Sequence, residues 1–554
     1  MIFCRGMGGK VRRLKLETSS KGGGGKNDRD GGRRGEAGVG AGVGGWYDGW
    51  MKTGYGELVR EMREISVLSS IGSVLGWDER TGMPAKGAGH RGDQAAMVAG
   101  MVHSRFTSEK IGELIEKSEG EVKGLAGSSV EGANVREVKR RYGRQKKLPS
   151  SLVEEISRTT VMSEQAWAGA RKANDYGAFK PWLGKMYDLK HQEIACYGIE
   201  TEAYDALLED YEPGEKAANL RVVFEGLRGP LVELVGKIGE ASKRGRAAPM
   251  EVLMRKYPAG GQERFARKAA AAIGFDFEGG ALAVSTHPFC SGMGPGDVRM
   301  TTRYDEEYFG DAFFGVLHES GHALYEQGLP GEHYGLPAGE AISLGIHESQ
   351  SRMWENLVGR SRSFWRHFMP GLREEFPDAT KGVSDDEWYR AVNDVRPSLI
   401  RVESDEATYN LHILLRFELE TALLEKTLGV DDLPGAWAEK MKKYLGIEVP
   451  SDREGCMQDV HWSAGLVGYF PTYTLGNLYS AQFFEQARKD LGDLDGMFAR
   501  GEFAPLLGWL RTNIHAWGQR LRAPELVEKV TGRGLSAEPL LKHLRGRAAE
   551  VYGV

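Results

Sequence analysis

The chain has 554 residues, of which 41% are hydrophobic and 27% are charged, a balance typical of a globular protein with a large core. Its formal net charge of −5 gives no case for a nucleic-acid partner, and no run of 18 apolar residues predicts a membrane span. The four cysteines, Cys4, Cys196, Cys290 and Cys456, contain no CxxC pair. They argue against a disulfide framework and favour a reducing compartment, the cytoplasm.

Residues 1–45 are rich in glycine and basic side chains. Such a segment cannot bury enough apolar surface to offset its chain entropy, so we expect a disordered extension without a function of its own. An organelle transit peptide is the alternative, but serines are few and acidic residues are present, and no secretory apolar core is found. A translation start at Met51 is a third interpretation. The rest of the chain, 46–554, is expected to form a single domain.

This domain is dominated by helical periodicity. Apolar residues at three- and four-residue spacing predict helices over 55–73, 152–172, 179–197 and 216–242. Strand alternation is scarce, and short extended pieces are expected only at 281–288 and 298–303. The predicted fold is therefore mainly α, with a small β element.

The most informative stretch is the HExxH motif from His318 to His322. Residues four apart lie on one face of a helix, so both imidazoles can reach one zinc-type ion, and Glu319 projects beside them as a general base. The preceding run, 308–317, is aromatic and apolar, which predicts a buried helix. Buried polar groups require partners, and a metal ion would satisfy them. The implied chemistry is hydrolysis.

A third ligand can come from Glu340, which lies 18 residues after His322, or from Glu348, 26 residues after it. Either carboxylate leaves one coordination position open, as a catalytic site requires. The pattern with a third histidine is excluded, because Tyr325 and Gly328 occupy its positions. A di-iron bundle is excluded because it needs two Glu-x-x-His motifs and the chain has one.

Several further motifs surround the HExxH in a fixed order, and together they make the chain resemble the carboxypeptidase Taq family of metallocarboxypeptidases. The resemblance covers roughly residue 50 to the C-terminus, with Ser404 standing where the family usually has alanine. The motifs are GWDERTGMP at 76–84, HPF at 287–289, DVRMT at 297–301, HESQS at 347–351, IRVESD at 400–405, GCMQDVHW at 455–462 and GYFPTY at 468–473.

The resemblance implies a large helical metallopeptidase fold with a long central groove and the β element near the active site. It implies that Glu348 completes the metal site with His318 and His322, around one divalent ion, zinc or cobalt. Glu340 then becomes a candidate for orienting a histidine ring. Glu319 is expected to accept the proton of the attacking water and to deliver it to the leaving amine.

Two further roles follow from the resemblance and from residue type. His461 and Tyr473 are candidates to stabilise the oxyanion, with Asp459 fixing the His461 ring. Arg401 is expected to bind the free C-terminal carboxylate of a peptide substrate, because a planar guanidinium suits a carboxylate; Arg352 is the alternative.

The expected function is thus a carboxypeptidase of broad specificity that releases single C-terminal residues. A homodimer is carried over from the family. The alternatives are a zinc endo-oligopeptidase and an inactive scaffold that binds peptide or metal. Retention of Glu319 disfavours the scaffold.

Overall fold

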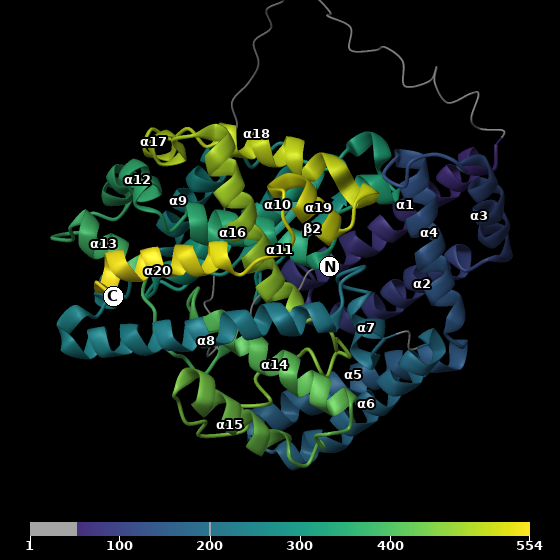
Figure 1. The fold of residues 1–554 in the computed structure, drawn as a ribbon, viewed down its shortest axis with the longest axis horizontal. Coiled ribbons are helices and arrows are strands. Elements are labelled where there is room, and N and C mark those ends of the chain that lie inside the picture. The colour runs from purple at the N-terminus through teal and green to yellow at the C-terminus, as the bar shows by residue number, and fades with distance from the viewer. Residues whose placement is uncertain (1–52, 199–200) are drawn as a thin grey trace, which may run out of the picture.

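The structure, a computed structural model, describes residues 53–198 and 201–554. The predicted extension over 1–45 lies outside the described residues. The predicted mainly helical fold with a small β element is confirmed (Figure 1). In the part of the chain that the structure describes, no helix combines the length and the apolarity that crossing a bilayer requires.

The N-terminal half of the described chain is almost entirely helical. Each of the four predicted helices is present, and three of them extend beyond their predicted ranges. Thr53 starts the first one by accepting a hydrogen bond from the amide of Gly56. The helices are α1 (Gly54–Thr81), α2 (Ala88–Phe106), α3 (Glu109–Glu121), α4 (Val130–Lys147), α5 (Ser150–Ala173), α6 (Tyr176–Tyr197), α7 (Ala203–Leu208), α8 (Ala217–Ala241) and α9 (Ala259–Ala272).

The small sheet follows α9 and has the strand order β1-β3-β2. Strand β1 (Gly280–Val284) pairs in parallel with β3 (Asp297–Thr302), and β2 (Cys290–Gly294) pairs with β3 in antiparallel register. The prediction of one extended piece over 281–288 is wrong in its second half. There the chain turns, with the Ser285 hydroxyl donating to the His287 carbonyl, and Pro288 has no amide to offer a ladder.

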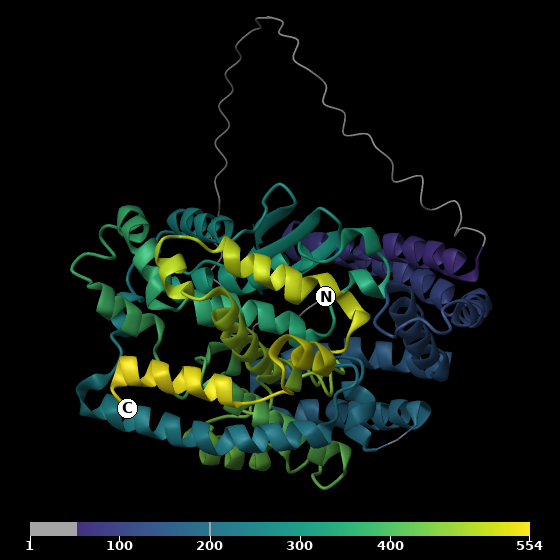
Figure 2. The same ribbon diagram turned by 45° about the horizontal axis from the view of Figure 1, so that its top comes forward.

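Strand β2 was not predicted, because its glycines give it little intrinsic strand preference. It is an edge strand whose other neighbour is α1, and Figure 2 shows the sheet beside that helix. The β element thus lies between the N-terminal helices and the segment that carries the HExxH motif.

The C-terminal half is helical again, and α10, α11 and α16 occupy the middle of the molecule (Figure 1). Near the surface, α20 packs along α8. The helices are α10 (Phe309–Glu326), α11 (Leu344–Arg352), α12 (Arg362–Glu375), α13 (Asp385–Val392), α14 (Thr408–Leu424), α15 (Leu433–Leu445), α16 (Pro471–Leu491), α17 (Leu494–Ala499), α18 (Ala504–Asn513), α19 (Ala523–Thr531) and α20 (Glu538–Tyr552).

Candidate metal centre

Helix α10 carries the HExxH motif through the core. Almost every residue from Phe309 to Tyr325 is buried, as the apolar run before the motif predicted. His318 and His322 are both fully buried, and their ring centroids lie 4.9 Å apart on one face of the helix. Glu319 is buried beside them, and its charge adds to burial in raising the pKa of the Cys290 thiol in β2. The Glu319 carboxylate therefore lies near the sheet.

Helix α11 brings Glu348 to the two histidines because two glycines allow close packing. A Cβ on Gly321, inside the HExxH motif, would lie 2.5 Å from the backbone of Gln350 in α11. A Cβ on Gly476, in α16, would lie 2.4 Å from the Glu348 side chain. Helix α11 is thus held tightly between α10 and α16, with Glu348 directed at the histidine pair.

The three side chains form a compact donor set. Glu348 Oε2 lies 3.6 Å from His318 Nε2 and 3.4 Å from His322 Nε2. All three ligand atoms lie within 4.8 Å of one another. The two Nε2 atoms are buried and have no hydrogen-bond partner among residues 53–198 and 201–554. Two orphaned imidazole nitrogens facing one carboxylate fit a divalent ion of the zinc type.

The electrostatics prepare both kinds of ligand for this role. Burial lowers the pKa of His322 to about 3, so its ring is neutral at physiological pH, the form that can bind a metal. Burial alone would raise the pKa of Glu348, but the Arg352 guanidinium holds it well below its usual range. The carboxylate is therefore ionised.

The other candidate ligand, Glu340, lies outside this cluster. Its carboxylate accepts hydrogen bonds from Arg141 at 2.5 Å and from Gln519 at 3.5 Å. The role of orienting a histidine ring, expected for Glu340, is therefore not what the structure shows. Glu340 and Glu348 both lie at a distance from His322 along the sequence that a third metal ligand could have. Only the path of the connection between α10 and α11 decides that Glu348 reaches the histidines and Glu340 does not.

Glu355 is a buried residue of the centre that sequence reasoning missed. Its Oε2 lies 2.8 Å from His318 Nδ1 and 3.5 Å from Nη1 of Arg352. Arg352 also donates from Nε to Glu348 Oε1 at 2.7 Å. A signal was present, since Glu355 follows Glu348 by seven residues and so shares its helical face. The structure thus places Arg352 against the ligand set, between two carboxylates.

A second buried cluster is built around Asp459. Arg401 donates to Asp459 Oδ1 from Nε at 3.0 Å and from Nη2 at 2.8 Å, and Arg416 donates to Oδ2 from Nε at 2.7 Å. Burial would raise the pKa of Asp459, but the two guanidinium groups hold it well below its usual range. Sequence reasoning missed Arg416, which no quoted motif contains.

His461 and Tyr473 adjoin this cluster. The His461 Nε2 atom lies 3.1 Å from the Tyr473 hydroxyl. Burial, followed by the charge of Arg401, lowers the pKa of His461 to about 3. The expected role of Asp459 in fixing the His461 ring is not borne out by the distance, because Asp459 Oδ1 lies 3.9 Å from His461 Nδ1.

Tyr409 joins the two clusters, and it too was missed from the sequence. Its hydroxyl accepts a hydrogen bond from Arg401 Nη1 at 2.8 Å, and the Arg352 guanidinium carbon lies 4.3 Å from its ring centroid. Tyr473 is linked as well, because it precedes Gly476 by three residues and so shares the face of α16 that touches Glu348. Apart from Glu340, the predicted site residues therefore lie in one connected region.

Comparison with known proteins identifies the family of the chain. A family model described as carboxypeptidase Taq (M32) metallopeptidase matches residues 57–548. The chain is 48% identical over 516 residues to thermostable carboxypeptidase 1 of Thermus thermophilus, covering 90% of this chain and 99% of the relative. It is 34% identical over 491 residues to carboxypeptidase 1 of Bacillus subtilis, covering 89% and 97%.

Solved structures give the same result. The M32 carboxypeptidase from Deinococcus radiodurans superimposes with a TM-score of 0.87 at 39% identity, covering 90% of this chain and 100% of that one. Metallocarboxypeptidase 1 of Trypanosoma cruzi gives a TM-score of 0.85 at 36% identity, covering 89% and 99%. The chain therefore belongs to the carboxypeptidase Taq (M32) family and is a metallocarboxypeptidase, a hydrolase that acts on peptides.

Proposed function

We propose that this enzyme releases single residues from free peptide C-termini with broad specificity, using one divalent ion, zinc or cobalt, held by His318, His322 and Glu348. The observation that carries the proposal is the buried donor set, with its two orphaned Nε2 atoms, linked through Tyr409 to a cluster of buried arginines. When bound, such an ion would polarise the scissile carbonyl as a Lewis acid.

The chain's own groups divide the remaining work. Glu319 takes a proton from the attacking water onto its carboxylate and returns it to the leaving amine. We propose that His461, which is neutral because its pKa is lowered to about 3, donates from Nε2 to the Tyr473 oxygen, and that the Tyr473 hydroxyl in turn donates to the developing oxyanion. Removal of one such donor typically costs about a hundred- to a thousandfold in kcat.

Arg401 is proposed to bind the terminal carboxylate of the substrate. Support comes from the charge of its cluster, since Arg401 and Arg416 share the single carboxylate of Asp459. Two positive groups and one negative group leave one positive charge in excess, in a buried place where an anion would be attracted strongly. Arg352 is the alternative, but it is ion-paired with Glu348 and Glu355.

The test is a double cycle on one peptide. Amidation of the C-terminus removes the charge, and it should reduce kcat/KM about ten- to a hundredfold, since a charge-assisted hydrogen bond is worth about 1.5–3 kcal/mol. Arg401→Ala should cost a similar factor on the free peptide and little more on the amide, because both changes delete one contact. Arg401→Lys keeps the charge and should recover part of the loss.

The outcomes separate the alternatives. If the two effects multiply, Arg401 does not bind the carboxylate, and the cycle is repeated with Arg352. Amidated peptides cut at internal bonds as fast as free ones would favour the zinc endo-oligopeptidase. Metal binding without turnover of any peptide would favour the inactive scaffold.

A homodimer in the cytoplasm completes the proposal. The dimer rests on the family resemblance, and the location is supported by the free thiols of Cys196, Cys290 and Cys456. Light scattering after size exclusion should give close to twice the chain mass of 61.1 kDa. A mass equal to that of one chain would contradict the dimer.

A further inference from the structure

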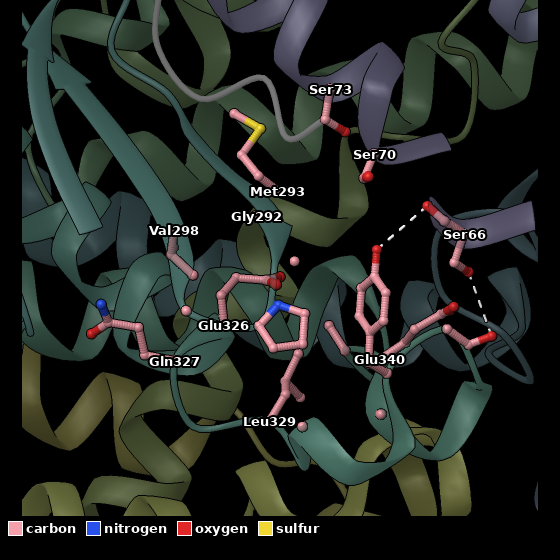
Figure 3. A pocket seen from close by; sticks show the side chains of 18 of the residues that line it. Ser66, Ser70, Ser73, Gly292, Met293, Val298, Glu326, Gln327, Leu329 and Glu340 are labelled. Atoms are coloured by element: carbon pink, nitrogen blue, oxygen red, sulfur yellow. Dashed lines mark hydrogen bonds between the residues drawn. The ribbon is translucent and has the colours of Figure 1, made fainter. Parts of the chain in front are cut away.

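A pocket of about 420 Å³ lies next to the metal centre, between α1 and the glycine-rich strand β2 (Figure 3). Two carboxylates, Glu326 and Glu340, contribute to its wall. Glu340 is paired with Arg141, as described above. Glu326 is the last residue of α10, one turn beyond His322, and its side chain is 27% exposed. The Glu326 carboxylate lies where the pocket adjoins the metal centre.

From Glu326 a chain of two hydrogen bonds runs inward to a metal ligand. Glu326 Oε1 lies 2.9 Å from His347 Nε2, and His347 Nδ1 lies 2.5 Å from His322 Nδ1. His347 is buried and precedes Glu348 in α11. This series of hydrogen bonds therefore crosses from Glu326 in α10 to His347 in α11 and returns to His322 in α10.

Hydrogen-bond chemistry fixes the direction of this chain. A carboxylate only accepts hydrogen bonds, so Nε2 of His347 carries the proton that it donates to Glu326. In a neutral imidazole the other nitrogen then accepts, so His347 Nδ1 receives a proton from His322 Nδ1. His322 therefore keeps its free lone pair on Nε2, the atom that faces Glu348 Oε2 at 3.4 Å. The Glu326 carboxylate, as the acceptor at the outer end, therefore selects the tautomer of His322.

We propose that His347 and Glu326 are positioning residues that hold His322 in the tautomer and orientation needed for metal binding. His318 has a shorter device of the same kind, since its Nδ1 lies 2.8 Å from the carboxylate of Glu355. Acceptors behind metal-bound histidines commonly perform this task. The inference rests on the proposed metal site.

Gly292 makes room for the outer end of the chain. A Cβ at this position in β2 would lie 2.8 Å from Glu326 Oε2. Figure 3 shows Gly292 and Glu326 next to each other in the pocket wall. The missing side chain in β2 thereby leaves the space in which the Glu326 carboxylate reaches His347.

The test measures metal binding itself. Protein freed of metal with a chelator is titrated with Co²⁺, followed by its visible absorption, and with Zn²⁺ in competition with a chromophoric chelator. Wild type should bind one equivalent. Glu326→Ala and His347→Phe should each weaken binding about ten- to a hundredfold and alter the Co²⁺ spectrum. The double variant should be little worse than either single variant, because Glu326 acts through His347.

Two glutamine variants provide matched controls. Glu326→Gln should stay within about threefold of wild type, because its amide oxygen can still accept the His347 proton. Glu340→Gln removes a carboxylate from the same pocket without touching the chain of hydrogen bonds, and its metal affinity should be unchanged. Thermal midpoints of the metal-free variants report folding, and Glu326, being partly exposed, tolerates substitution better than His347.

The possible failures are distinguishable. If wild type binds no equivalent of metal, the proposed metal site itself is wrong. If wild type binds metal and both Glu326→Ala and His347→Phe bind it with the same affinity, the positioning role is overturned. A Glu326→Gln variant as weak as Glu326→Ala would overturn the tautomer argument, since charge alone would then matter. An equal loss in Glu340→Gln would point to the general field of the pocket instead.

Discussion

Two buried carboxylates lie beside the same histidine pair, and their surroundings separate their tasks. Glu348 is held ionised by Arg352 and faces both Nε2 atoms, as a metal ligand requires. Glu319 lies on the side of α10 near Cys290 in β2. The first carboxylate is suited to hold a cation and the second to exchange a proton.

This division predicts different effects for two equally small changes. Glu319→Gln should retain one equivalent of metal and lower kcat by at least about a hundred- to ten-thousandfold, because it removes the base but no ligand. Glu348→Gln should lose most of the metal, since it removes an ionised ligand. Elemental analysis of the purified variants, together with peptide turnover, checks both statements. Full metal content in Glu348→Gln would contradict the ligand assignment.

At the scale of elements, the centre depends on how closely α11 packs between α10 and α16. Gly321 and Gly476 allow approaches that no side chain with a Cβ could match, since the atoms they face lie 2.4–2.5 Å from the added carbon. Distances under 3 Å force a shift, and in a close-packed interior the shift is transmitted to the neighbouring side chains. The geometry of the metal ligands is therefore set by helix packing.

Gly476→Ala tests this dependence. The new methyl group would push against Cβ and Cγ of Glu348, so we expect a loss of about 1–3 kcal/mol of stability and at least about a tenfold weaker metal affinity. Gly508→Ala in α18 is the matched control, because a Cβ there meets nothing within 4 Å. It should leave metal binding unchanged and raise the thermal midpoint slightly. Equal behaviour of the two variants would contradict the packing argument.

At the scale of the whole molecule, α11 is anchored by a residue from a distant part of the chain. Glu212 is fully buried, and it accepts hydrogen bonds from the Ser343 hydroxyl and the Gly345 amide at the start of α11, and from Tyr479 in α16. Burial raises the pKa of Glu212 to about 7, despite these donors. The N-terminal half of the chain thus helps to position the segment that carries Glu348.

The raised pKa makes this contribution depend on pH. The folded protein holds the Glu212 proton up to about pH 7, whereas the unfolded chain releases it near pH 4.5. The stability associated with this proton is complete below pH 4.5 and is lost as the pH rises through 7, an effect of at most about 3 kcal/mol. Glu420 is buried with its pKa raised to about 7 in the same way, so it adds to the trend.

Glu212→Gln should therefore reduce the pH dependence of the thermal midpoint. Relative to wild type, the variant should gain up to about 3 °C between pH 4.5 and pH 8.5, as measured by calorimetry. Glu233 provides a control whose pKa is shifted in the opposite direction, because it is exposed and Lys237 lowers its pKa. Glu233→Gln should produce a barely measurable change. A constant difference between Glu212→Gln and wild type across this range would contradict the burial argument.

The sequence by itself determined the features that depend on the spacing of residues close together in the chain. The helix periods, the burial of α10 and the shared face of His318 and His322 depend on residues within a few turns of one another, where the backbone geometry leaves little choice. The ordered motifs identified the family and pointed to Glu348. The strand β2 escaped because its glycines have no strand preference of their own and pair only where β3 is already present.

Only the tertiary structure decided which polar groups meet across long separations. Glu340 pairs with Arg141 instead of a histidine, Asp459 pairs with two arginines rather than with the His461 ring, and His347 bridges Glu326 and His322. Each of these side chains has several partners that it could reach by residue type alone. The choice follows from close packing, which leaves a buried polar group with whichever partner the neighbouring helices bring within hydrogen-bond distance.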